Sequence, residues 1–116
     1  MADTFEYSSD TSRALSHVLD ERARQDAKWG NQDHRRDRIS ASELDVYATE
    51  RDWCRNECDR HEVEDKANGG ASWTDILLEE TFEALAESDP VKLRAELVQV
   101  AAVAVSWIES IDRRKV

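Results

Sequence analysis

The chain has 116 residues, a net charge of −10, and only three glycines and one proline. This length corresponds to a single domain, and so few turn-forming residues exclude a fold of many strands but suit a few long helices. Twenty-six acidic residues against sixteen basic ones, without a long basic cluster, argue against duplex DNA or RNA as a partner. We therefore expect an all-α protein.

The N-terminal third of the sequence predicts an arm, a helix and a loop. Residues 1–9 lack hydrophobic periodicity and are expected to form a flexible arm, so that residues 10–116 make the single helical domain. Apolar residues at helical spacing predict a first helix that begins near Ser9 or Asp10 and ends at Trp29, before Gly30. The polar segment NQDHRRDRIS that follows predicts a loop.

A second helix is expected from about residue 42 to residue 64, with a weakly apolar second half that is expected to be mobile or partly disordered. Residues 35–70 are therefore a candidate lid or variable insertion. Cys54, Cys58 and His61 form the pattern C-x3-C-x2-H in this helix. These residues offer three ligands for zinc, but a structural zinc site normally has four. Two half-buried reduced thiols are the favoured interpretation, with the zinc site as the alternative.

Two further helices are predicted after the glycine-containing turn at residues 67–71. The sequence Ser-Trp-Thr-Asp, which starts at Ser72, resembles a capping box and predicts a helix that continues to about Glu87. Ser88-Asp89-Pro90 then predicts a compact turn, with Pro90 as the first residue of a last helix that ends near residue 113.

The last helix contains the most apolar stretch of the chain. Between residues 97 and 108 only Gln99 and Ser106 are polar. Twelve residues are too few to cross a bilayer, and the N-terminus lacks a signal-peptide pattern, so we expect a cytoplasmic protein without membrane contact. A helix that is apolar nearly all round is expected to be buried on all sides. This predicts an antiparallel bundle of about four helices that is completed by self-association, as a homodimer or homotetramer.

Acidic and amide side chains recur on the last two predicted helices at matching levels. Glu79, Glu80 and Glu83 precede the Ser88-Asp89 turn, and Glu96 and Gln99 follow it. At 1.5 Å per residue, Glu83 and Glu96 lie roughly 7 and 10 Å from the turn, and Glu80 and Gln99 roughly 12 and 15 Å. Converging oxygen ligands of this kind suit Mg²⁺.

Each part of this pattern has a plainer alternative. The glutamates of the third helix are also typical of a solvated helix face. Gln99 lies in an apolar stretch where an unpaired amide is costly, so it is expected to bind either an ion or a neighbouring helix through a hydrogen bond.

The motif Glu79-Glu80-x-x-Glu83, followed after twelve residues by Glu96-x-x-Gln99, resembles the EExxE…ExxD signature of the MazG-like all-α NTP pyrophosphatases. The segment ERARQDAKWGNQDH resembles a stretch of small bacterial and phage members of this family, and the resemblance covers about half of the chain. It implies a hydrolase that converts an NTP or dNTP and water to the nucleoside monophosphate and pyrophosphate, with Mg²⁺, or Mn²⁺ as a substitute.

The resemblance also implies the metal ligands, which are Glu80, Glu83, Glu96 and Gln99. Gln99 stands where the family has aspartate, so the site has one negative charge fewer. Glu79, beside the ligands, is our candidate for orienting the attacking water or accepting its proton, with a solvent-facing role as the alternative.

For the base, sugar and phosphates, the candidate substrate-binding residues are Gln25, Lys28, Trp29 and His34. Trp29 is suited to stacking on a base, Gln25 to hydrogen bonding with its edge, and Lys28 to a phosphate. Each residue has a structural alternative, as a helix-end core residue or a solvated side chain. A second hypothesis for the whole protein is a non-catalytic MazG-like relative that binds a nucleotide or a protein partner as a helical dimer.

Overall fold

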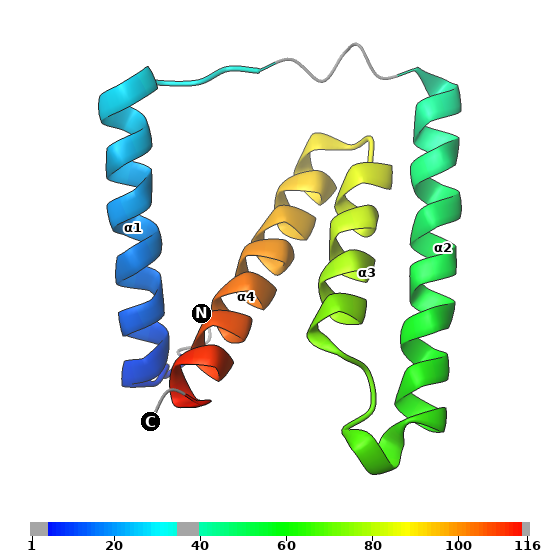
Figure 1. The fold of residues 1–116 in the computed structure, drawn as a ribbon. Coiled ribbons are helices and arrows are strands. Elements are labelled where there is room, and N and C mark those ends of the chain that lie inside the picture. The colour runs from blue at the N-terminus through cyan, green and yellow to red at the C-terminus, as the bar shows by residue number, and fades with distance from the viewer. Residues whose placement is uncertain (1–4, 35–39, 115–116) are drawn as a thin grey trace. The chain divides into compact units, whose positions relative to one another are not determined.

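The structure, a computed structural model, describes residues 5–34 and 40–114. Within these residues it is all-helical and contains no strand, which confirms the prediction of an all-α protein. Figure 1 shows the four α-helices and one short 3₁₀ turn: α1 (Ser9–Trp29), α2 (Ala41–Glu64), η1 (Lys66–Asn68), α3 (Trp73–Ala86) and α4 (Pro90–Arg114).

Local signals set the ends of the first helix close to their predicted places. The hydroxyl of Ser8 accepts a hydrogen bond from the backbone N–H of Thr11, so the cap lies one residue before the predicted position. Gly30 ends α1 with a φ of 66°, which is favourable for glycine because it has no Cβ. The predicted arm lies partly outside the described residues, as does the 31–40 loop at residues 35–39.

The second half of α2 differs from the expectation of partial disorder, because it is a regular helix to Glu64. Arg60 forms ion pairs on the helix surface with Glu57 and with Glu64, the latter at 3.0 Å. Such pairs one turn apart support a helix face that has few apolar residues.

A tight turn leads from α2 to α3. Gly70 has a φ of 76°, and a Cβ there would lie 2.6 Å from Oε2 of Glu62. That carboxylate accepts the backbone N–H of Ala71 at 2.9 Å. Glycine at position 70 thus lets the Glu62 side chain close the turn.

The predicted starts of α3 and α4 are confirmed. Ser72 and Asp75 form a complete capping box at the start of α3, each side chain accepting the other residue's backbone N–H. Pro90 is the first residue of α4, and Oδ1 of Asp89 accepts the N–H of Val91 at 3.2 Å.

The chain divides into two compact units, with a boundary inside α4. In the first, α1 contacts the end of α4: Thr11 donates a hydrogen bond of 2.6 Å to Glu109, and Ala14 and Ser110 are buried. In the second, residues 36–104, α2 lies beside α3 (Figure 1). Cys54 and Ala84 are buried there, and the rings of Tyr47 and Phe82 lie 6.5 Å apart between the two helices.

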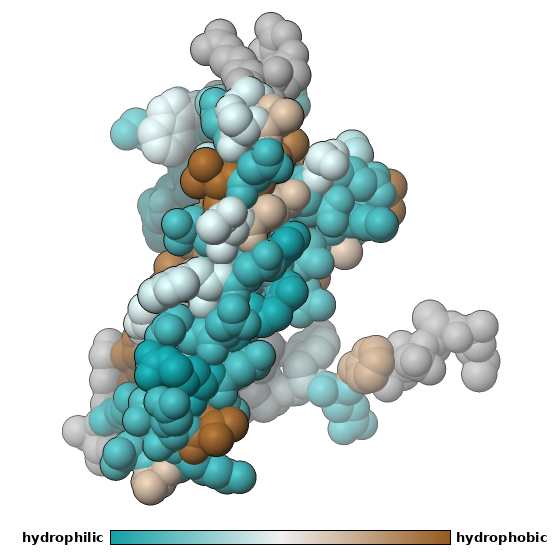
Figure 2. Space-filling model, turned by 90° about the vertical axis from the view of Figure 1, so that its right-hand side faces the viewer, coloured by the Kyte–Doolittle hydropathy of each residue, from teal (hydrophilic) through white to brown (hydrophobic). Residues whose placement is uncertain are grey.

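Residues 97–108 are not buried on all sides within the single chain, and their predicted burial against a second copy stays a prediction. Leu97 is 52% exposed and Val98 is 56% exposed, while residues 103–108 are half-buried. The physical reason is that the described helices bury few side chains fully, so they cannot surround one of their number. The hydropathy view in Figure 2 shows a largely hydrophilic face with small separate apolar patches. None of the described helices is long and apolar enough to cross a membrane.

Candidate metal centre

Three glutamates from two helices meet in the second unit. Glu80 and Glu83 lie one turn apart on α3, and Glu96 lies on α4 beyond the short Asp89 turn. One oxygen of each carboxylate lies within 4.8 Å of those of the other two, and all three side chains are half-buried. Among the described residues this acidic triad is the one such group of His, Cys, Asp or Glu side chains. The fold thus brings together three of the four metal ligands predicted from the sequence.

Glu80 has the least favourable environment of the triad. Its Oε2 is buried, and no donor within the described part of the chain reaches it. Burial raises the pKa of the Glu80 carboxyl, and the charges of Glu83, Glu96 and Glu79 raise it further, as does a hydrogen bond of the protonated acid with Glu83. The ionised form of Glu80 therefore lacks a partner, which a bound cation would supply.

Arg55 of α2 reaches the edge of the triad. Its Nη2 donates a 2.9 Å hydrogen bond to Oε1 of Glu83, and its Nε lies 3.8 Å from Oε1 of Glu79. The hydrogen bond to Glu83 raises the pKa of Arg55, so the guanidinium remains charged. Arg55 was not predicted from the sequence, because no local pattern specifies how α2 is aligned with α3. The one available signal in the sequence was that the neighbouring glutamates of α3 need a positive charge nearby.

Glu79, the candidate for proton transfer, lies beside the triad and contacts α2. In addition to its ion pair with Arg55, it raises the pKa of the Cys58 thiol through its negative charge and as a hydrogen-bond acceptor. Burial is the largest cause, and together with Glu79 and other nearby acidic charges it raises the pKa of Cys58 to about 12. Glu79 is half-buried rather than solvent-facing, and its catalytic role stays a prediction.

Gln99 is not buried within the single chain, and the burial against a second copy that the sequence predicts stays a prediction. It is exposed, as are Leu97 and Val98 on the same stretch of α4. In the single chain the Gln99 amide is therefore accessible to water and does not need a partner within the protein. Its role as the fourth ligand stays a prediction based on its position one turn after Glu96.

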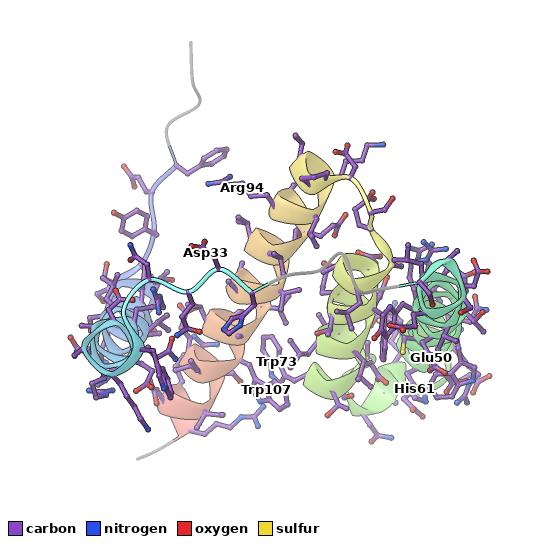
Figure 3. The ribbon with its side chains drawn as sticks, turned by 90° about the horizontal axis from the view of Figure 1, so that it is seen from above. Asp33, Glu50, His61, Trp73, Arg94 and Trp107 are labelled. Carbon is purple, nitrogen blue, oxygen red and sulfur yellow. The ribbon has the colours of Figure 1, made fainter. Side chains whose placement is uncertain are left out.

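The alternative zinc site in α2 has no support in the described residues. Cys54 and Cys58 are free thiols, and they do not form a metal-ligand group with His61. Instead Nδ1 of His61, which is labelled in Figure 3, donates a 2.9 Å hydrogen bond to Oδ2 of Asp75. This bond joins the end of α2 to the capping box of α3, so His61 has a structural partner.

The candidate substrate-binding residues lie in the first unit. Trp29 and His34 line an open pocket of about 570 Å³ with three polar residues of the segment after α1: Asn31, Gln32 and Asp33. Asp33 is labelled in Figure 3. This volume falls in the usual range for small-molecule sites. Trp29 is 58% exposed.

The other two candidates lie on the last turns of α1. Lys28 places Nζ 4.7 Å from the centroid of the Trp29 ring. Gln25 accepts a 2.9 Å hydrogen bond from Arg22. The pocket and the acidic triad belong to different units.

Comparison of the chain with protein-family models, with curated proteins and with solved structures found no match. The likeness to MazG-like enzymes therefore rests on the motif residues alone and stays a hypothesis.

Proposed function

We propose that this protein is a MazG-like, Mg²⁺-dependent nucleoside triphosphate pyrophosphohydrolase. It would convert an NTP or dNTP and water to the nucleoside monophosphate and pyrophosphate. The observation that supports this proposal is the acidic triad, in which three carboxylates converge and Oε2 of Glu80 is buried without a donor. Oxygen donors in this arrangement fit a hard divalent cation, either Mg²⁺ or Mn²⁺.

Each acidic residue would have a separate task. Glu80, Glu83 and Glu96 would hold the cation, and Gln99 would add a neutral amide oxygen. When bound, Mg²⁺ would neutralise phosphate charge and make a coordinated water more acidic. Glu79 would orient the attacking water or accept its proton, and its half-buried place beside Glu80 supports this assignment.

The candidate substrate-binding residues would contact the base, the sugar and a phosphate. Trp29 would stack on the base, with His34 lining the same pocket. Gln25 would hydrogen-bond the edge of the base, and Lys28 would contact a phosphate. The free thiols Cys54 and Cys58 and a nucleotide substrate both suit the cytoplasm, which we propose as the location.

Self-association is part of the same proposal. Leu97 and Val98 of α4 and Leu19 of α1 are each more than half exposed, which supports burial against a second copy as a homodimer or homotetramer. Sedimentation equilibrium of the protein, and of a Leu97→Glu variant, tests this part. A monomer at micromolar concentration would contradict it.

The alternative is a non-catalytic relative that binds a nucleotide or a protein partner as a helical dimer. Gln99 favours this alternative, because an amide in place of a carboxylate lowers the charge available to the cation. Gln99→Asp distinguishes the two. Activity in the variant alone would indicate that the natural protein has lost catalysis.

The test of the main proposal is pyrophosphate release from a panel of NTPs and dNTPs with Mg²⁺ or Mn²⁺. We would compare the wild type with Glu96→Gln and Glu83→Gln, and use Glu50→Gln as the control, because Glu50 is an exposed glutamate of α2. We expect metal-dependent release that the two triad variants lose and the control keeps. Release that persists in both triad variants, or no release at high enzyme concentration, would refute the catalytic proposal.

A further inference from the structure

Arg55 already supplies a positive charge to the carboxylates beside the proposed metal site. Its guanidinium contacts Glu83, a member of the triad, and Glu79, one turn earlier on α3. The two glutamate side chains are about one-fifth exposed, and that of Arg55 is 46% exposed. Arg55 is thus more hydrated than either glutamate, and its guanidinium can move into solvent at little cost in free energy.

We propose that Arg55 is an internal counter-cation that competes with the divalent ion for Glu83 and so sets the affinity of the site. This inference rests on the proposed function, because it concerns the same metal site. Arg55 is a positioning residue here, since it acts through Glu83 and is not itself a metal ligand.

The competition follows from charge and from hydrogen-bond geometry. In the metal-free protein the guanidinium offsets the repulsion among the acids, and its planar group of donors suits two carboxylates one turn apart. A divalent ion bound to Glu83 would repel Arg55, because both are positive. Binding therefore requires that the 2.9 Å hydrogen bond from Arg55 to Glu83 lengthens or breaks.

A purely structural role for Arg55 predicts a different result. In that case the residue only holds α2 against α3, and its loss would lower stability equally with and without metal. If Arg55 competes with the ion, its loss must tighten metal binding. The sign of the change in affinity therefore separates the two roles.

The test is calorimetric titration of Mn²⁺ into the wild type, Arg55→Gln and Arg51→Gln. Arg51 is the matched control, because it lies one turn earlier on α2 and pairs with Asp52 at 3.0 Å. We expect Arg55→Gln to bind Mn²⁺ about tenfold more tightly, which is the effect of removing a unit charge about 6 Å from a divalent ion in water-like screening. Arg51→Gln should stay within about twofold of the wild type, because its charge is compensated locally.

A second measurement needs no variant. In the ¹⁵N-labelled wild type, the Arg55 Nε–H resonance should shift and saturate as Mg²⁺ is added. An unmoved resonance at saturating Mg²⁺, or equal or weaker Mn²⁺ binding by Arg55→Gln, would overturn the inference and leave the proposed function standing. If Arg55→Gln binds the ion and the wild type does not, the inference holds and the proposed function fails. If neither binds, both fail.

Discussion

Replacing Glu80 with glutamine should stabilise the protein in the absence of divalent cations. Oxygens of Glu83 and Glu96 lie within 4.8 Å of the Glu80 carboxylate. At that distance two like unit charges repel by about 0.9 kcal/mol in water and by about 3.5 kcal/mol at an effective dielectric constant of about 20. Because the triad is only partly buried, solvent still screens its charges, and Arg55 partly neutralises Glu83, so we use the lower value for each of the two pairs.

We therefore expect Glu80→Gln to raise the free energy of unfolding by about 1–2 kcal/mol, since the amide removes both repulsions and can donate to a neighbouring carboxylate. This corresponds to a rise in Tm of about 5 °C for a chain of this size. The assay is thermal unfolding followed by circular dichroism at pH 7, first in EDTA and then with Mg²⁺. Mg²⁺ should stabilise the wild type and leave Glu80→Gln unchanged, because the variant has lost a ligand.

The pH dependence gives an internal control. The pKa of Glu80 is raised above its ordinary value of 4.5, so its ionisation destabilises the fold as pH rises through the folded-state pKa. The advantage of Glu80→Gln should therefore shrink as the pH falls toward 4.5, where the wild-type acid is protonated. Glu50→Gln should show no such trend. A Glu80→Gln variant that is less stable than the wild type in EDTA at pH 7 would refute the reasoning.

Three further predictions concern the second unit. Because the pKa of Cys58 is about 12 instead of 9.0, its alkylation by iodoacetamide at pH 8 should be roughly a thousandfold slower than that of an ordinary thiol. The ordinary rate should return when urea unfolds the protein, and rapid labelling of the native protein would contradict this prediction. Asp75→Asn should lower the free energy of unfolding by about 1 kcal/mol in urea titrations, because it weakens the capping box and the bond from His61. Partial burial raises the pKa of Asp75, but hydrogen bonds from Ser72 and His61 outweigh this effect and lower the pKa below its ordinary value of 3.8. The loss of stability in Asp75→Asn should therefore disappear as the pH falls below that value, because the wild-type carboxylate becomes protonated. A loss that persists in acid would show that the charge of Asp75 is not responsible. Gly70→Ala should also destabilise the protein, since the added Cβ meets Glu62 at a positive φ, and an unchanged Tm would show that the turn adjusts freely.

The ends of the helices could be predicted from the sequence because their causes are local. The capping box of Ser72 and Asp75, the first-turn proline Pro90 and the terminating Gly30 each act within a few residues of the backbone that they fix. Their positions were therefore predicted to within one or two residues.

The acidic triad was also predictable in large part. Glu80 and Glu83 share a helix face through their spacing, and a short turn at Asp89 brings Glu96 back to their level. Because the connection between α3 and α4 is short, the distance of each glutamate from the turn can be calculated from the sequence, and the rest of the fold has little influence on it.

Only the tertiary structure decided the contacts between α2 and α3 and the exposure of α4. Arg55 reaches Glu83, and His61 reaches Asp75, across separations of 28 and 14 residues. Helix pairs can be aligned in several registers with similar local energies, so periodicity cannot select one. Gln99 shows the same limit, because hydrophobic patterning indicates which side chains favour burial but not which surface covers them.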